Sequence, residues 1–219
     1  MRLTKPTFLR AAALTAGLLA TALLASCSSK PASIGDVRPD DMTLGSPDAK
    51  VTMVEYASVA CPICGHFTTD LWPEVKAKYV DTGKVRYVYR PMPMGVPTIA
   101  LSGELLAECA GKGRYFTVVD AIMRGQQTFY KNYTVETDAY ARPVLVDIAK
   151  SMGMSEDEFN TCVTNQANAK KVSDRFNDYL QKDGVNETPT FFINGKKLER
   201  TKGDITDFDN AIQPLLKAN

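Results

Sequence analysis

The sequence predicts an α/β domain in which a block of helices is inserted between the strands of one sheet. Two β-rich segments, residues 51–56 and 84–90, stand in the first half of the chain, and a third at 190–193 stands near its end. The long segment 98–182 has the apolar periodicity of helices instead. The element order is therefore β, α, β, a helical block, a β-hairpin and a final helix, which is an α/β order with a helical insertion.

Each strand is predicted from its own residue pattern. Residues 51–56 form an apolar run, and residues 84–90 alternate between apolar and polar side chains before a proline. Residues 190–193 are followed by Asn194-Gly195, a dipeptide typical of the two-residue type I′ hairpin. The chain is therefore expected to turn there and to return as a short strand at 196–198.

The segment 61–80 is predicted to be a helix. Phe67, Leu71 and Val75 recur at spacings of four residues, so they share one helix face. Pro73 lies within this segment, and a proline inside a helix removes one backbone hydrogen bond and clashes with the preceding turn. We therefore expect Pro73 to kink or interrupt the helix.

The segment 98–182 is predicted to contain several helices, each with an apolar stripe. Ser155 and Glu158 form a capping box that opens one of them. An amphipathic helix at 207–217 is expected to end the fold. The helices of the inserted block are expected at residues 99–109, 116–123, 144–149, 155–163 and 168–180.

The N-terminus is typical of an exported protein. Basic residues precede an apolar stretch at 11–25 that is short for a membrane span, as in a secretory signal. The stretch ends in Leu-Ala-Ser-Cys at 24–27, which is similar to the box at which bacterial lipoproteins are cleaved and acylated. Residues 1–26 are therefore expected to be a signal peptide and Cys27 to carry the lipid; the alternative is a plain signal with an incidental cysteine. The polar residues 27–44 are expected to be a flexible tether.

The charge argues against nucleic-acid binding, and the cysteine content suits an oxidising compartment. The whole chain has a formal charge of +1, and removal of residues 1–26 takes it to −2. A near-neutral domain has no electrostatic attraction to nucleic acid, so no nucleic-acid partner is expected. Export implies an oxidising compartment, in which the four cysteines beyond Cys27 can form disulfides.

A C-P-I-C motif, Cys61-Pro62-Ile63-Cys64, follows the first predicted strand and opens the helix. Unpaired N–H groups and the helix dipole at such a position lower the pKa of a thiol and favour its reactive thiolate. Cys61 is therefore expected to be the exposed nucleophile and Cys64 the buried resolving thiol. A structural disulfide or half a zinc site is the alternative. Zinc takes four ligands, whereas the chain has one His and no second C-x-x-C, so neither a metal nor a cofactor is expected.

These motifs in this order resemble the DsbA-like branch of the thioredoxin superfamily. The resemblance rests on the C-P-I-C motif, on Thr-Pro-Thr at 188–190 and on the Phe-Phe-Ile-Asn-Gly hairpin at 191–195. It implies a thioredoxin fold built from residues 45–97 and 183–219, with residues 98–182 as an inserted α-helical domain.

The same resemblance implies further site residues. Pro189 matches the family's cis-proline, which faces the redox cysteines, and Thr188 before it is expected near the nucleophilic thiol; a trans proline is the alternative. Glu55 matches an acid beneath the site that is expected to exchange a proton with the resolving thiol, unless it faces solvent. Arg86 is a possible charge partner for that acid, and His66 is expected to be either a surface residue or a contact of the site.

Ile63 stands between the two cysteines, where strongly oxidising relatives often carry a histidine. Its side chain offers the thiolate neither a hydrogen bond nor a charge. A less stabilised thiolate makes the disulfide less oxidising, and one ordinary hydrogen bond corresponds to roughly 30 mV. We therefore expect a weaker oxidant than a C-P-H-C relative.

Cys109 and Cys162 lie on apolar stripes of two expected helices of the inserted block. In an exported protein, two buried thiols on neighbouring helices are expected to form a disulfide, here a structural one. Two free buried thiols are the alternative.

The sequence thus predicts a lipid-anchored, periplasm-facing thiol–disulfide oxidoreductase of the bacterial cell envelope. It is expected to introduce disulfides into reduced exported proteins and to be reoxidised by a membrane thiol oxidase of DsbB type. A monomer is expected, because residues 28–44 are too few for the dimerisation domain of the family's isomerases. One alternative is a reductase or isomerase kept reduced by a membrane donor. The other is a copper-binding lipoprotein that uses the two thiols and His66.

Overall fold

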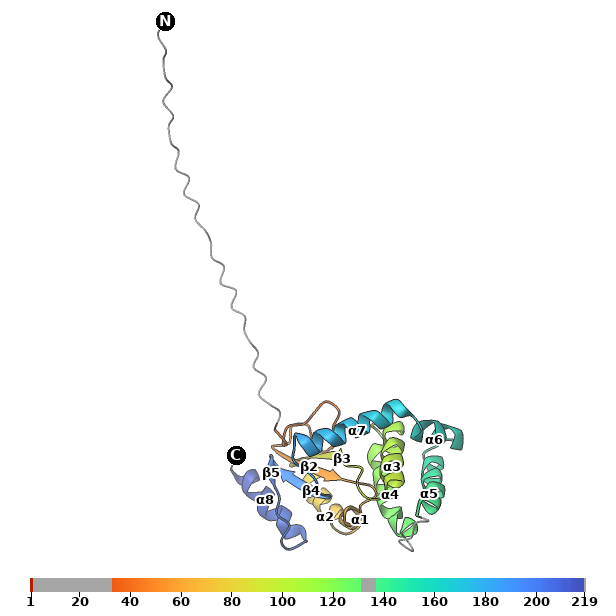
Figure 1. Cartoon of the computed structure of the whole chain (residues 1–219). Helices are drawn as coiled ribbons and strands as arrows, with labels where there is room; N and C mark the ends of the chain where they lie inside the picture. The colour runs from red at the N-terminus through yellow and green to blue at the C-terminus, as the bar shows by residue number, and fades with distance from the viewer. Residues whose placement is uncertain (2–32, 131–136, 219) are drawn as a thin grey trace. The chain divides into compact units, whose positions relative to one another are not determined.

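The sheet places the strand that precedes the C-P-I-C motif at its centre. This strand, β2 (Val51–Ala57), lies between β3 (Val85–Pro91), which is parallel to it, and β4 (Thr190–Ile193), which is antiparallel. The chain therefore returns to its first long strand after the helical block, and the predicted α/β order is confirmed (Figure 1). The structure, a computed structural model, describes residues 1, 33–130 and 137–218.

The edges of the sheet are short strands. At one edge β1 (Met42–Leu44) pairs antiparallel with β3, and at the other β5 (Lys196–Lys197) pairs with β4. The turn before β5 has positive φ angles at Asn194 and Gly195, as the predicted type I′ hairpin requires. The expectation of a tether up to residue 44 is wrong for β1, because three residues with a mixed pattern form a strand only by pairing with β3.

The segment before β1 is also held against the body, by the buried side chain of Arg90. Its guanidinium donates to the carbonyl oxygens of Ile34 and Asp36 at 3.0 and 2.8 Å and pairs with the Asp41 carboxylate at 2.9 Å. A charge supplied from β3 therefore orders a polar segment whose composition predicts a tether. Residues 2–26 of the expected signal peptide, the expected lipid-bearing Cys27 and the first part of the tether, 28–32, lie outside the described residues.

The helix that follows β2 is not uniform. α1 (Pro62–His66) and α2 (Trp72–Val75) are α-helical, whereas Phe67–Leu71 and Lys76–Val80 make wider, π-helical turns. Pro73 lies in the first turn of α2, where it has no N–H to donate to the preceding turn. The expected interruption at Pro73 is therefore a widened turn, and the chain stays helical through it.

Helices fill the segment between β3 and β4, and one more ends the fold. They are α3 (Pro97–Cys109), α4 (Tyr115–Phe129), α5 (Thr137–Ser151), α6 (Glu156–Val163), α7 (Gln166–Gln181) and, after β5, α8 (Ile205–Lys217). The predicted capping box of Ser155 and Glu158 is present at the start of α6. In Figure 1, α3, α4, α5 and α6 stand beside the sheet, and α7 runs back across it towards β4.

Helices cover both faces of the sheet. On one face Tyr56 of β2 packs edge-on against Tyr179 of α7, with ring centroids 5.3 Å apart. On the other face a larger apolar cluster joins the sheet to α1, α2, α8 and the inserted helices. There Phe67 lies between Phe191 of β4 and Phe208 of α8, with centroid distances of 4.7 and 5.8 Å. The helix that carries the C-P-I-C motif is thus packed on the central strands.

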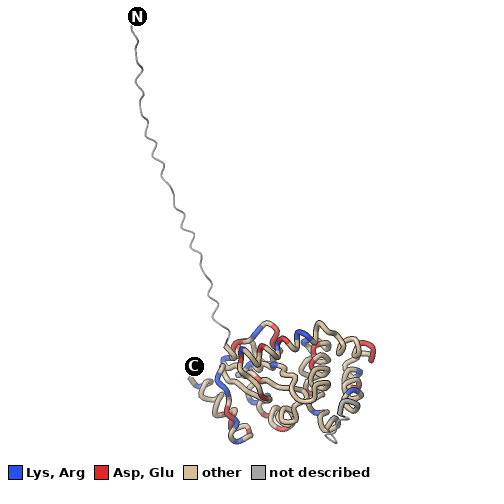
Figure 2. The backbone as a smooth tube through the Cα atoms, in the orientation of Figure 1, with Lys and Arg blue, Asp and Glu red and all other residues tan. Residues whose placement is uncertain are grey.

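The described helices can be compared with the length and apolarity that a membrane span needs. None of the helices within residues 33–130 and 137–218 is long and apolar enough to cross a membrane. Basic and acidic residues are interspersed along the helices and loops (Figure 2).

Candidate active site

The C-P-I-C motif lies where the central strand gives way to α1. β2 ends at Ala57, a tight turn follows, and Cys61 is the N-cap residue of α1 with extended backbone angles (φ −88°, ψ 118°). Pro62 occupies the first helical turn, where the N–H that it lacks would have no partner. Cys61 is 9% exposed and Cys64 is fully buried, and both are reduced. Cys61 is thus the more exposed of the two thiols, but its side chain is itself largely buried, so the expectation of an exposed nucleophile is wrong in that respect.

The surroundings of Cys61 favour its thiolate. The Cys64 thiol, the Thr188 side chain and the backbone N–H groups of Cys64 and Ile63 lower the pKa of Cys61 to about 5, against the opposing effect of burial. The pKa of Cys64 moves the other way, well above its ordinary value, because the thiol is buried and lies beside Cys61. At neutral pH the pair therefore holds one thiolate, on Cys61, and one thiol.

The segment before β4 faces the nucleophilic thiol. The Thr188–Pro189 bond is cis, the isomer that the resemblance implies. The Cys61 Sγ atom lies 3.4 Å from the carbonyl oxygen of Thr188, to which the thiol donates when Cys61 is protonated. The Thr190 hydroxyl donates to the carbonyl oxygen of Glu187 at 2.8 Å and fixes the turn that carries Pro189. Thr188 thus lies against Cys61, although 127 residues separate the two in sequence, and Pro189 follows it through the cis bond.

Glu55 lies in β2 beneath the motif and is 2% exposed. The Tyr87 hydroxyl donates to its Oε2 atom at 2.6 Å, whereas Oε1 is buried without a hydrogen-bond partner among the described residues. Burial raises the pKa of Glu55 to about 8, although Tyr87 and the positive charge of Arg200 oppose the shift. The carboxyl group is therefore largely protonated at neutral pH. It is not the solvent-facing acid of the alternative interpretation.

Arg86 is not the charge partner of Glu55. In the β2–β3 ladder it lies opposite Thr52, and the positive charge that acts on Glu55 belongs to Arg200, which follows β5. The Arg200 guanidinium stacks over the rings of Phe67 and Phe191, at 5.6 and 5.4 Å from their centroids. Sequence reasoning missed Arg200 and Tyr87, because only the folded sheet brings them to the acid.

A cavity of about 410 Å³ reaches Glu55. Tyr87 and Trp72 line it beside the acid, and Phe116 and Arg124 of α4 line it on the side of the helical block. The buried acid therefore adjoins a cavity that residues of the sheet and of α4 line together.

The side chains of His66 and Ile63 are exposed to solvent. The His66 side chain is 74% exposed, and its Nδ1 atom lies 3.6 Å from the Asp70 carboxylate. Ile63 is 61% exposed. Across residues 33–130 and 137–218 no three His, Cys, Asp or Glu side chains gather as metal ligands would. His66 is thus a surface residue, one of the two expected possibilities.

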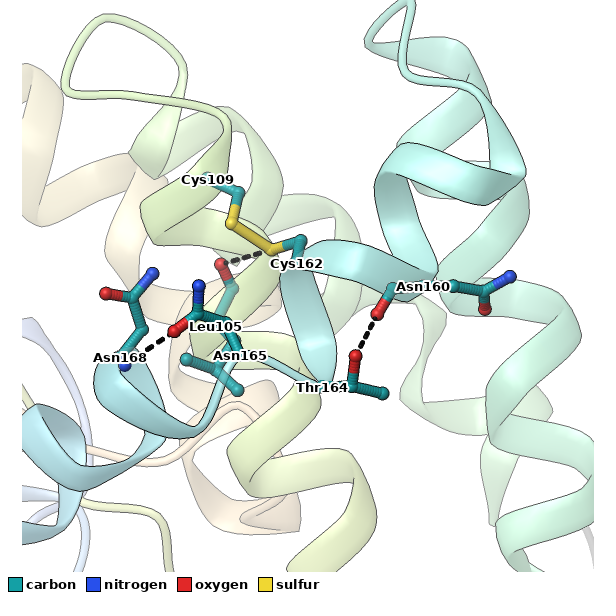
Figure 3. Close-up of a disulfide and its surroundings, with 7 residues drawn as sticks. All are labelled: Leu105, Cys109, Asn160, Cys162, Thr164, Asn165 and Asn168. Atoms are coloured by element: carbon teal, nitrogen blue, oxygen red, sulfur yellow. Dashed lines mark hydrogen bonds between the residues drawn. A yellow bond between two sulfur atoms is a disulfide. The ribbon is translucent and has the colours of Figure 1, made fainter.

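A disulfide joins α3 to α6 through Cys109 and Cys162, 53 residues apart in sequence (Figure 3). The Cys162 sulfur lies 3.1 Å from the carbonyl oxygen of Leu105. Cys162 is buried but Cys109 is exposed at the end of α3, so the expectation of two buried sulfurs is wrong for Cys109. The apolar stripe of α3 ends before Cys109, and the side chain lies at the rim of the helical block.

Comparison with known proteins agrees with this geometry. The family model described as "Thioredoxin" matches residues 37–213. A Rickettsia bellii protein assigned as a protein-disulfide oxidoreductase is 31% identical over 160 residues, which cover 73% of this chain and 59% of that protein. The chain therefore spans less than two thirds of the length of this relative.

Solved structures extend the likeness over nearly the whole fold. Wolbachia pipientis alpha-DsbA1 superposes with a TM-score of 0.73 and 27% identity, covering 83% of this chain and 94% of that one. A protein-disulfide isomerase from Novosphingobium aromaticivorans gives a TM-score of 0.68 and 26% identity, with 80% and 97% coverage. The family match, the inserted helical domain and the geometry around the C-P-I-C motif together show that the chain belongs to the thioredoxin family and has its DsbA-like form.

Proposed function

We propose that the protein is a thiol–disulfide oxidoreductase that works through Cys61 and Cys64. One observation carries the proposal. Cys61 combines a pKa of about 5 with a place at the start of α1, directly against Thr188, while Cys64 behind it is buried and protonated. A thiolate beside a thiol that stays protonated is the arrangement that disulfide exchange requires.

The steps of disulfide exchange follow from the different pKa values of Cys61 and Cys64. When the site is oxidised, a substrate thiolate attacks the Cys61 sulfur, the Cys61–Cys64 bond breaks, and Cys64 leaves with the electron pair and takes up a proton. A second substrate thiolate then attacks the substrate sulfur of the mixed disulfide, and Cys61 leaves as a thiolate. The substrate loses two electrons and the protein gains them. The low pKa of Cys61 favours the last step, because a more acidic thiol is the better leaving group.

Glu55 is proposed to supply the proton that Cys64 takes up. Its carboxyl group is largely protonated at neutral pH, since burial raises its pKa to about 8. The proposal is supported by the charge of Glu55, which is one of the influences that raise the pKa of Cys64 after burial and the neighbouring Cys61. The cavity beside Glu55 then allows it to be reprotonated from solvent.

We further propose that the protein acts as an oxidase on exported proteins, anchored by a lipid on Cys27 and facing the periplasm. The signal-like N-terminus supports export, and the Cys109–Cys162 disulfide suits an oxidising compartment. The substrates are reduced cysteine pairs of exported proteins, and a membrane thiol oxidase restores the disulfide. A monomer suffices, because Cys61, Cys64, Thr188 and Pro189 all belong to one chain.

The redox state of Cys61 and Cys64 in growing cells tests the direction of electron flow. Cells are quenched with acid, free thiols are alkylated with a reagent that adds mass, and the protein is examined on a gel. The proposal predicts that the pair is mostly oxidised. A mostly reduced pair contradicts the oxidase assignment and favours the reductase or isomerase, for which the apolar, solvent-facing Ile63 gives some support.

A further inference from the structure

The tight turn that leads into Cys61 is enclosed by protein, and its backbone carbonyl groups need partners inside the fold. The Ser58 carbonyl accepts from the Cys61 N–H at 3.0 Å, and the Cys61 carbonyl accepts from the Gly65 N–H at 3.0 Å. Val59 and Ala60, which lie between them, are 2% and 0% exposed. Their carbonyl groups receive hydrogen bonds from the inserted helical domain.

The side chain of Gln126 in α4 reaches both sides of this turn. Its Nε2 atom donates to the Val59 carbonyl at 2.8 Å and to the Cys61 carbonyl at 3.1 Å, and the residue is 5% exposed. The Tyr130 hydroxyl, one helical turn further, donates to the Ala60 carbonyl. Both N–H bonds of one buried amide are therefore directed at the backbone that precedes and includes the nucleophile.

Two glycines allow the helices to approach the turn this closely. A Cβ atom on Gly65 would lie 2.3 Å from Oε1 of Gln126, and one on Gly103 of α3 would lie 2.8 Å from a methyl group of Val59. Side chains at these positions would push the inserted helices away from the turn. The close approach of α4 to α1 therefore depends on the absence of a side chain at Gly65.

We propose that Gln126 is a positioning residue for Cys61, which holds the turn so that the Cys61 sulfur stays over the first N–H groups of α1. The sulfur takes its place from the Cys61 backbone, and Gln126 bonds to that residue and to the residue two before it. Loss of the amide leaves the buried Val59 carbonyl without a partner, and the turn must move to find one. The inserted domain is therefore part of the redox site.

The variant Gln126→Met tests this, because it keeps the length of the side chain and removes both donors. Titration of the thiolate absorbance at 240 nm reports the pKa of Cys61. We expect that pKa to rise by about one unit. The equilibrium with glutathione is expected to shift about tenfold towards the oxidised protein, because a less stabilised thiolate weakens the oxidant. Gln127→Met, at an exposed position of the same helix, is the matched control and should change neither value.

A purely structural role for Gln126 gives a different result. If Gln126→Met lowers the melting temperature but leaves both the Cys61 titration and the glutathione equilibrium unchanged, the proposal is wrong.

Gly65→Ala supplies the second test, since its methyl group displaces the Gln126 amide from the opposite side. It should raise the Cys61 pKa as well, and the double variant should show no larger shift than the larger single one. Additive shifts would mean that the two residues act independently and would overturn the proposal. Gly65→Ala alone decides if Gln126→Met does not fold.

Discussion

Opposing effects meet at the Cys61 sulfur. Burial disfavours its thiolate, whereas the Cys64 thiol, Thr188 and the N–H groups at the start of α1 favour it. These hydrogen-bonding contacts outweigh the effect of burial, because the pKa of Cys61 falls from 9.0 to about 5. The pKa of Cys64 moves in the opposite direction, because the thiol is buried and because a second negative charge beside a thiolate is unfavourable. The pair therefore releases one proton easily and the other with difficulty.

The pH dependence of the reduction potential follows from the low pKa of Cys61 and the raised pKa of Cys64. Below pH 5 reduction consumes two protons with two electrons, so the potential should fall by about 59 mV per pH unit. From pH 5 to about pH 8 only Cys64 takes up a proton, and the slope should halve to about 30 mV per unit. Equilibration with glutathione buffers across this range measures the slope. A slope near 59 mV throughout would mean that the pKa of Cys61 is that of an ordinary thiol.

Glu55→Gln should slow the exchange steps that protonate or deprotonate Cys64. The amide keeps the shape of the side chain but cannot pass on a proton, and positioned acids and bases typically contribute 10²- to 10⁴-fold. We expect at least a tenfold loss in the rate of dithiol oxidation, and loss of the inflection near pH 8 from its pH profile. Stopped-flow tryptophan fluorescence follows the reaction, because Trp72 lines the cavity beside Glu55.

Glu55→Gln should also change how stability depends on pH. The pKa of Glu55 is raised in the folded protein, so its burial destabilises the fold increasingly as pH rises from its ordinary value of 4.5 to about 8. The variant should therefore gain stability relative to the parent protein at pH 8 and above, and not below pH 4. Unchanged exchange rates together with an unchanged stability difference would contradict the role given to Glu55.

At the scale of elements, local patterns account for most of the helices and strands. β2, β3 and β4 were predictable from apolar runs, and the start of α6 from its capping box. β1 was not, because it is short and exists through its pairing with β3. The π-helical turns near Pro73 were not predictable either, because proline can disturb a helix in several ways and the sequence does not say which one occurs.

Some residues of the candidate site were also predictable from the sequence and others were not. Cys61 and Cys64 were predictable from a short motif and its place between a strand and a helix. Thr188 and Pro189 were predictable only through family resemblance, because nothing local marks a cis bond. Arg200, Tyr87 and Gln126 contact or influence the site from three other parts of the fold. Nothing in the sequence around them marks them as site residues. Tertiary contacts alone reveal such residues.

The bridge between α3 and α6 should contribute to stability. It closes a loop with a separation of 53 residues, for which the loss of entropy in the unfolded chain corresponds to about 4 kcal/mol. The double variant Cys109→Ala/Cys162→Ala should therefore unfold at a clearly lower urea concentration. A loss below about 1 kcal/mol would show that contacts between the helices already hold the block together without the bridge.

At the scale of the whole molecule, the redox site lies where the sheet and the inserted domain meet. β2 and α1 supply the thiols, the segment before β4 supplies Thr188 and Pro189, and α4 reaches in from the insertion. α7 covers one face of the sheet, and α1, α2 and α8 cover the other (Figure 1). The site is thus fixed by several elements that are distant in sequence. Small changes in their packing are expected to alter the thiolate before they unfold the protein.

Mixed-disulfide trapping is the most direct test of the central claim, that Cys61 is the attacking thiol and Cys64 resolves its products. The variant Cys64→Ala is incubated with a peptide that contains a disulfide, and the products are digested and analysed by mass spectrometry without reduction. We predict one stable adduct, on Cys61, which the parent protein resolves and the variant Cys61→Ala does not form. A folded Cys64→Ala protein that forms no adduct, or an adduct on another cysteine, would contradict the account.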